Sequence, residues 1–434
     1  MSRRFANPAL LLPAFLVAAP TIGAESLLLS GATVHTVSGE TVSPGQVLIK
    51  DGKIAAVGAS VEVNGAKVID LKGQHLYPGL IAADSTLGLS EISAVRATRD
   101  DTEVGQYTPD VRAWMAVNPD SELIPVSRAN GITHANVIPH GGIVAGQSGI
   151  VKLEGWTIED MTTKSPSGLH VFWPGMELDT RSKEEWKDKS KWRSLADQAK
   201  ERRAKVKELA EFFLEAKAYA KAKGSAADGK FETVPAWEAM LPFVRGEIPL
   251  VVHADELRQI RAALILAETN GYRMVLVGGR DAGELADQIA RLHVPVVFDS
   301  VFTLPPQDST GYDVQFKVPL RLHKAGIKIA FSEDGRFGAS SLRNLPYVAS
   351  QAVAFGLPRE IALKGITLFP AEILGVHDRL GSIEPGKEAS LIAVDGDILD
   401  LRSNVKRMWI SGNEVSLESR HTRLYEKFRQ RPKK

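Results

Sequence analysis

The middle of the chain alternates apolar strands with helical segments, and this alternation limits the possible folds more than any other feature. The apolar runs are GITHANVIP, IPLVVHA, RMVLVGG, VPVVFDS and IKIAFSED, and helical stretches such as DELRQIRAALILAETN and AGELADQIARLH lie between them. Strands that alternate with helices indicate βα units around a parallel sheet. The number of such units over residues 78–382 favours an α/β fold with a closed (β/α)8 TIM-like barrel over an open sheet.

Both ends of the chain have a different texture. Residues 25–77 and 383–415 contain short runs in which apolar and polar residues alternate, such as LLLSGATVHTV and VKRMWISGNEV, with turn signals such as Asp51-Gly52 between them. Alternation with a period of two indicates strands that are buried on one face. We therefore expect a small β-sandwich domain formed from both ends of the chain.

Two further segments lie outside these domains. Residues 181–223 form a charged, alanine-rich run with opposite charges four residues apart, such as Glu201 and Lys205. This pattern predicts a helical insertion in the barrel, either a solvated helix or a surface that docks a partner. Residues 416–434 form a C-terminal tail.

The first 24 residues are expected to be a signal peptide. Arg3 and Arg4 precede the apolar stretch ALLLPAFLVAAP, and TIGA ends in small residues that a signal peptidase accepts, which predicts cleavage after Ala24. The alternative is a membrane anchor, but the apolar run is short for spanning a bilayer and contains prolines. We therefore expect export to the periplasm or the medium.

Charge and cysteine content exclude several functions. The chain has 53 basic and 52 acidic residues, and cleavage removes only Arg3 and Arg4 from this balance. A near-neutral chain gives no reason to expect nucleic acid or a membrane surface as a partner. The absence of cysteine excludes disulfides, thiolate nucleophiles and cysteine-ligated zinc.

In a parallel barrel, the catalytic residues lie where the strands end and the βα loops begin. This rule gives a list of candidates: Asp84, Thr86, His134, His140, His170, His253, Asp255, Arg280, Asp281, Asp299, Glu333 and Asp334.

Some of these candidates have two interpretations. His134 is either a ligand or a hydrogen-bonded histidine inside the barrel wall. The glycines after His140 either present backbone N–H groups to a substrate or form a tight connection with positive φ. Arg280 either grips an anionic substrate or pairs with Asp281. His170, at a strand end, is expected to face the pocket.

Several long motifs resemble the amidohydrolase superfamily, and in particular its exported imidazolonepropionase-like branch. SGATVHTVSG and VLIKDGKIAAVG resemble the opening strands of the family, and LYPGLIAADSTLGL resembles the entry to its first barrel strand. LKGITLFPAEILGV and GSIEPGKEASLIAV resemble the last helix of the barrel and the return to the small domain. The resemblance implies a metal-dependent hydrolase that acts on carbon–nitrogen bonds of amides or cyclic amides, or occasionally on ester bonds.

The resemblance also implies a set of metal ligands, and this chain carries only part of it. The family's His-x-His pair on the first strand falls on Asp84 and Thr86, and its histidine on strand six falls on Gly278. The histidine on strand five is present as His253, and the aspartate on strand eight as Asp334. A bridging lysine or glutamate on strand four cannot be placed. Asp84, His253 and Asp334 are therefore the expected metal ligands, with Asp334 and His253 also catalytic.

Two functions remain open from the sequence. The first is a hydrolase of carbon–nitrogen bonds with an altered metal site, in which His140, His170 and Arg280 contact a small-molecule substrate. The second is an inactive homologue that binds a small molecule or pairs with an active amidohydrolase. The cofactor is accordingly one divalent metal, with zinc the first choice, or none; the family's binuclear centre is the third alternative. The expected assembly is a homodimer or a pairing with a related amidohydrolase.

Overall fold

The computed structural model describes residues 26–63, 65–226, 231–306, 309–333 and 338–432. The strands of this part of the chain form two eight-stranded sheets. The predicted signal peptide and Asp334 lie outside the described residues.

The larger sheet is a TIM-like barrel. Its strands follow one another in chain order: β6 (Leu80–Ser85), β7 (Ile132–Val137), β8 (Val144–Lys152), β9 (Thr162–Phe172), β10 (Leu250–Ala254), β11 (Met274–Gly278), β12 (Val296–Phe298) and β13 (Ile329–Phe331). Residues 365 and 366 connect the two edge strands, because Gly365 accepts a hydrogen bond from the Phe331 N–H and Ile366 accepts one from the Ile81 N–H. The barrel is therefore nearly closed.

One barrel strand does not run in the predicted direction. β8 is antiparallel to both β7 and β9, whereas β6 and β7 are parallel, as are β9 and β10. Only residues 138–143 connect β7 to β8. A parallel crossover needs a dozen or more residues, so a connection this short forces the next strand to return antiparallel. The expectation of parallel βα units throughout the barrel was wrong at this point.

The centre of the barrel is filled by small and branched side chains. Val251, Val275, Val297 and Ala330 come from four successive strands, and they pack in one cluster with Ala83 from β6. This packing is typical of the layered interior of a TIM barrel. These side chains therefore fill this part of the barrel interior.

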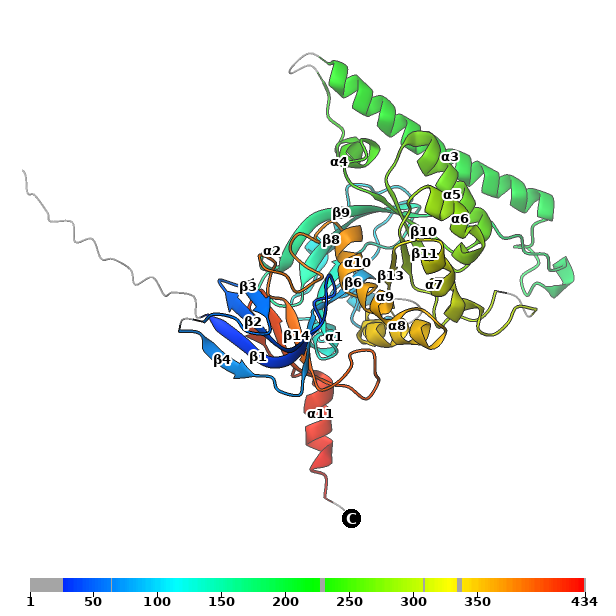
Figure 1. The fold of residues 1–434 in the computed structure, drawn as a ribbon. Helices are drawn as coiled ribbons and strands as arrows, with labels where there is room; N and C mark the ends of the chain where they lie inside the picture. The colour runs from blue at the N-terminus through cyan, green and yellow to red at the C-terminus, as the bar shows by residue number, and fades with distance from the viewer. Residues whose placement is uncertain (1–25, 64, 227–230, 307–308, 334–337, 433–434) are drawn as a thin grey trace, which may run out of the picture.

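Helices cover the outside of the barrel (Figure 1). They are α1 (Leu123–Arg128), α2 (Ile158–Met161), α3 (Leu195–Ser225), α4 (Pro235–Val244), α5 (Leu257–Asn270), α6 (Ala286–Arg291), α7 (Val314–Lys324), α8 (Leu345–Ala354), α9 (Arg359–Lys364) and α10 (Leu368–Ile373). The long α3 lies in the predicted charged insertion and starts at Leu195, because Ser194 caps it by accepting a hydrogen bond from the Asp197 N–H. Its buried residues Leu209 and Phe213 hold it against the body.

The second sheet takes strands from both ends of the chain. Its members are β1 (Leu27–Val34), β2 (Val42–Lys50), β3 (Lys53–Gly58), β4 (Lys67–Asp70), β5 (His75–Pro78), β14 (Leu391–Val394), β15 (Val405–Ile410) and β16 (Asn413–Val415). The two ends meet where β14 pairs antiparallel with β5. Whether this sheet forms a sandwich stays a prediction. A last helix, α11 (Arg420–Arg429), points away from both sheets (Figure 1).

Candidate metal centre

Three side chains at the carboxyl ends of barrel strands form a group that could hold a metal ion. Asp84 comes from β6, His170 from β9 and His253 from β10, and each offers one ligand atom within 4.8 Å of the other two. The first two side chains are buried and the third is half-buried. Strands that are far apart in the sequence thus bring one carboxylate and two imidazoles together.

Asp84 reaches this group because β6 is irregular. The register between β6 and β7 shifts between Ala82 and Ser85, so the strict alternation of inward and outward side chains breaks around Asp84. The Ser332 hydroxyl donates a hydrogen bond of 2.8 Å to the Asp84 carbonyl and fixes the backbone there. Asp84 is only 6% exposed. A buried carboxylate needs compensating partners, and a cation beside two imidazoles would be one.

His170 and His253 face each other across two neighbouring parallel strands. Their Nδ1 and Nε2 atoms, respectively, lie 2.8 Å apart, and the His253 ring stacks on Phe172 with the ring centroids 4.0 Å apart. Burial lowers the pKa of His170 to about 3 and that of His253 well below its usual value. Both rings are therefore neutral at neutral pH, which is the form that binds a metal.

The group fits a single metal ion. A catalytic zinc site typically has three protein ligands and one open position for water or substrate. Besides the nitrogen that faces His253, His170 carries a buried Nε2 that has no hydrogen-bond partner among the described residues. The site therefore has lone pairs to offer a cation. His170 was expected to contact substrate; its distance to His253, which the sequence does not give, makes it a candidate for the third ligand.

His140 lies beside this group without belonging to it. Its positive charge, when protonated, lowers the pKa of both His170 and His253, so it faces the same space. Its Nδ1 is 3.5 Å from the Asp101 carboxylate, and its ring meets Phe172 edge-on. The hydrogen bond from His140 holds the pKa of Asp101 at about 2. The Asp101 carboxylate is therefore ionised at neutral pH, and in this form it orients the His140 ring. Asp101 lies in a long loop without a motif, so no sequence pattern marks it as a functional residue.

The glycines after His140 serve a tight connection. Gly142 has a φ of +66°, and a Cβ added there would lie 2.7 Å from the Gly105 carbonyl oxygen. Only glycine tolerates both the conformation and the close approach. The interpretation as a tight connection with positive φ thus accounts for Gly142.

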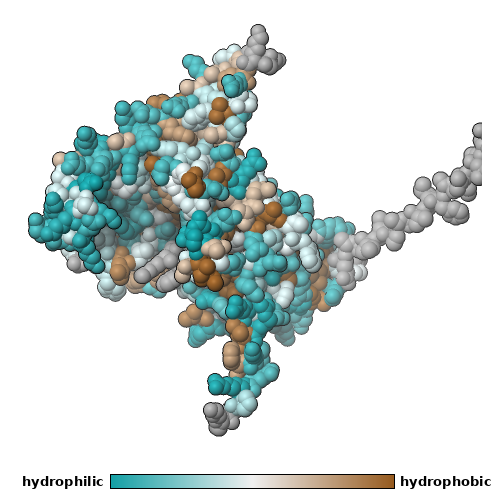
Figure 2. Space-filling model, turned by 180° about the vertical axis from the view of Figure 1, so that it is seen from behind, coloured by the Kyte–Doolittle hydropathy of each residue, from teal (hydrophilic) through white to brown (hydrophobic). Residues whose placement is uncertain are grey.

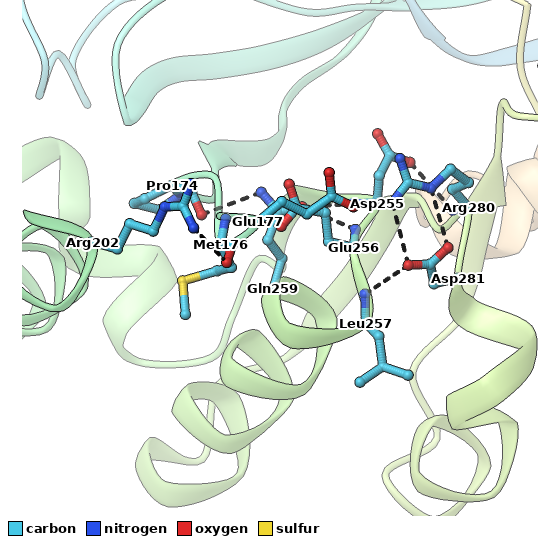
Figure 3. Close-up of polar contacts among 10 residues, drawn as sticks. All are labelled: Pro174, Met176, Glu177, Arg202, Asp255, Glu256, Leu257, Gln259, Arg280 and Asp281. Carbon is cyan, nitrogen blue, oxygen red and sulfur yellow. Dashed lines mark hydrogen bonds and ion pairs between the residues drawn. The ribbon is translucent and has the colours of Figure 1, made fainter. Parts of the chain in front are cut away.

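Arg280 is held by carboxylates at the mouth of the barrel (Figure 3). Its guanidinium contacts Asp281 at 3.1 Å and Glu177 at 3.1 Å. The Asp281 carboxylate also accepts a hydrogen bond from the Leu257 N–H, at the start of α5. Pairing with Asp281, one of the two interpretations of Arg280, is present in the structure. Substrate binding by this residue stays a prediction.

The same close-up shows how α3 is attached to the mouth (Figure 3). Arg202 donates a hydrogen bond of 3.0 Å to the Met176 carbonyl, and the Met176 N–H donates to the Glu256 carboxylate. Gln259 donates to the carbonyls of Trp173 and Pro174. These bonds fix the loop after β9, which borders the candidate metal centre.

At the position of the missing histidine on strand six, a neighbouring carboxylate fills the space. Gly278 has a φ of +90°, and a Cβ added to it would lie 2.6 Å from Asp255 Oδ1. Asp255 also accepts a hydrogen bond from the Arg280 N–H. Burial, together with the charge of Asp255, raises the pKa of Asp299, at the end of β12, to about 6. Asp299 can therefore carry a proton close to neutral pH.

His134 lies in the barrel wall, apart from the metal group. It is fully buried in β7, and its Nδ1 lies 3.0 Å from the Thr133 hydroxyl. Burial lowers its pKa to about 3. Among the described residues, it is not one of those that could hold a metal ion together. These observations favour the interpretation as a hydrogen-bonded barrel histidine.

The buried His134 predicts a loss of stability in acid. Above its usual pKa of 6.5 the ring is neutral in both states, but between 6.5 and 3 only the unfolded state takes up the proton. As the pH falls through this range, His134 therefore lowers the free energy of unfolding by up to about 1.4 kcal/mol per pH unit. We expect His134→Gln to flatten the pH dependence of urea unfolding between about pH 7 and pH 4.5. His377→Gln, at an exposed position, is the control, and an unchanged slope in His134→Gln would contradict the assignment.

Comparison with known proteins agrees with this architecture. The sequence pattern of the Amidohydrolase family matches residues 250–415. The crystal structure of an amidohydrolase from Thermotoga maritima MSB8 is 30% identical and superimposes with a TM-score of 0.79, covering 90% of this chain and 99% of that one. The chain belongs to the amidohydrolase superfamily.

Two curated amidohydrolase relatives differ in how much of the chain they match. A dihydroorotase from Pelotomaculum thermopropionicum is 24% identical over 86% of this chain and 89% of its own length. An imidazolonepropionase from Maricaulis maris is 29% identical over 150 residues, which are 34% of this chain and 36% of that protein. The match to the imidazolonepropionase thus spans only about a third of that relative.

Within the superfamily, the barrel strands are numbered from the first, so each candidate ligand can be assigned to a numbered strand. Counting from β6, the barrel strands one, four and five are β6, β9 and β10. His170 therefore lies on strand four, where the resemblance implies a bridging lysine or glutamate. A carboxylate has two oxygens and can bridge two metal ions, whereas a neutral imidazole offers one lone pair. The described ligands thus suit one metal ion rather than a bridged pair.

Proposed function

We propose that this protein is a hydrolase of carbon–nitrogen bonds in amides or cyclic amides, with a one-metal site. The observation that carries the proposal is the group formed by Asp84, His170 and His253 at the carboxyl ends of the barrel strands. When bound there, a divalent cation, for which zinc is our first choice, supplies Lewis acidity to a carbonyl and makes water more acidic. The names of the relatives, imidazolonepropionase and dihydroorotase, support this choice of reaction class.

Two groups near the carboxyl ends of barrel strands can move protons. An imidazole whose Nδ1 donates to Asp101 presents Nε2 as the second proton-exchanging atom, so His140 can accept a proton from an attacking water or donate one to a leaving amine. Asp299 has a pKa of about 6 and can act as an acid near neutral pH. Asp334 stays our proposed base on strand eight, on the strength of the sequence motif.

Sequence features alone suggest the substrate contacts and the location of the protein. We propose that His140 and Arg280 contact a small-molecule substrate at the mouth, and that the protein acts after export. We also keep the homodimer, or pairing with a related amidohydrolase, as the proposed assembly.

An inactive homologue is the second candidate. It is favoured by the contact between His170 and His253, because a hydrogen bond of 2.8 Å satisfies one nitrogen of each ring without a metal. The inactive homologue is also favoured by the absence of both first-strand imidazoles, since Asp84 and Thr86 stand at their positions.

Removal of the metal separates the two candidates. We expect the full chain, purified without chelators, to contain about one equivalent of divalent metal. Hydrolysis of N-acyl amino acids, dipeptides or cyclic amides should disappear after treatment with a chelator and return when Zn²⁺ or Mn²⁺ is added. Elemental analysis and a substrate panel measure both quantities. Metal far below one equivalent, with no gain on adding either ion, would establish the inactive homologue.

A further inference from the structure

The C-terminal helix α11 is exposed on nearly all sides. None of its residues from Arg420 to Arg429 is buried, and its large apolar side chains are 39% (Leu424), 64% (Tyr425) and 62% (Phe428) exposed. Figure 1 shows the helix projecting from the body, and Figure 2 shows hydrophobic atoms on the surface of this projecting segment. A helix with exposed aromatic residues far from the barrel mouth requires an explanation other than catalysis.

The side chains of α11 are segregated around its axis. With 100° per residue, Leu424, Phe428 and Tyr425 fall on one stripe, which also includes His421 at the start of the helix. Arg420 and Lys427 border the stripe on one side and Arg429 borders it on the other, whereas Glu426, the only acidic residue of the helix, lies opposite. An apolar stripe with basic borders is the pattern of a helix that lies in a membrane interface.

The contacts that attach α11 to the body involve residues near the start of the helix. Arg423, which lies on the face opposite the stripe, contacts Glu122 at 3.1 Å and Glu418 at 3.8 Å. Ser419 caps the helix by accepting a hydrogen bond from the Thr422 N–H, so the helix starts at the surface of the body. Near its base, His421 meets Arg343 at 3.0 Å.

The C-terminal region carries an excess of basic residues. Residues 420–434 contain seven lysines and arginines and a single acidic residue, although the whole chain has a net charge of only +1. The rest of the chain is therefore acidic. The expectation that no membrane would be contacted was drawn from the average charge, which conceals this separation. Several basic residues close to an anionic lipid surface each add to the affinity for it.

We propose that α11 docks on the surface of an anionic phospholipid bilayer, with its apolar stripe inserted between the headgroups. A second copy of the chain fits less well, because three side chains of a ten-residue helix cover far less than the roughly 1,200 Å² that a stable protein interface buries. Within the described ranges, every helix is too short or too polar to cross a membrane. The helix would hold the barrel close to the bilayer independently of its catalytic activity.

Vesicle sedimentation tests this proposal. We expect the full chain to pellet with vesicles of phosphatidylcholine mixed with phosphatidylglycerol, to pellet much less with phosphatidylcholine alone, and to be released by salt. The double variant Leu424→Ser/Phe428→Ser should bind the mixed vesicles about tenfold more weakly. Because α11 has no buried residues, the thermal unfolding midpoint of this double variant should equal that of the wild type.

A matched variant controls for exposed apolar residues in general. Trp156→Ser/Leu401→Ser removes side chains that are 93% and 72% exposed elsewhere on the surface, and it should bind vesicles like the wild type. The N-terminal segment is present in all samples, so only a difference between the two double variants reports on α11. Equal binding by both variants, or equal binding to neutral and anionic vesicles, would overturn the proposal. So would a dimer, seen in sedimentation velocity without vesicles, that only the α11 variant loses.

Discussion

His253→Gln is expected to remove the metal and to lower the hydrolysis rate by about 10³-fold or more, which corresponds to about 4 kcal/mol of transition-state stabilisation. Glutamine keeps most of the side-chain volume against Phe172 but loses the imidazole lone pair. With only Asp84 and His170 left in the described group, metal content should fall from about one equivalent to less than about a tenth. Elemental analysis and initial rates on the best substrate of the panel measure both effects.

The matched control for His253→Gln is the same substitution at His134. Both rings have their pKa lowered by burial, but His134 lies outside the candidate metal group. We expect His134→Gln to keep its metal and most of its activity at neutral pH. If both variants lose metal equally, the loss reflects damage to the barrel and not the removal of a ligand. If neither loses metal, the group is not the binding site.

Gly278→Ala is expected to lower the free energy of unfolding by about 2–4 kcal/mol, the largest effect we predict for a single methyl group. The added Cβ would lie 2.6 Å from Asp255 Oδ1 and would occupy a backbone conformation with a φ of +90°. Gly278→His, which restores the residue that the family resemblance implies, should be at least as unstable and should not bind a second metal. Urea unfolding measures the stability of both variants.

Gly271→Ala separates the two causes of this loss. Gly271 has a φ of +68°, and a Cβ added there would meet nothing within 4 Å. Its substitution should cost only the backbone strain, about 1 kcal/mol. Adding Asp255→Ala to Gly278→Ala should recover the difference between the two glycine sites. A Gly278→Ala variant as stable as wild type would show that Asp255 moves aside freely and does not fill the site.

The direction of β8 shows what a closer use of the sequence could have predicted. The six residues from Ile138 to Ile143 cannot contain a parallel crossover, and their count is visible in the sequence. The role of His170 is different, because its assignment to a ligand group depends on which residue of β9 lies beside His253. Asp101 is a third case, since it orients His140 from a loop that has no recognisable pattern.

By itself, the sequence determined the barrel, the pairing of the two chain ends in one sheet, the superfamily and the absence of the usual imidazoles at Asp84, Thr86 and Gly278. The sequence signals for these features are local, because periodicity and motifs are properties of neighbouring residues. The tertiary structure decided that Asp84 turns toward His170 and His253, and that Asp255 fills the space at Gly278. Those facts depend on strand register and on a shift of one strand against the next, which no single segment of the chain contains.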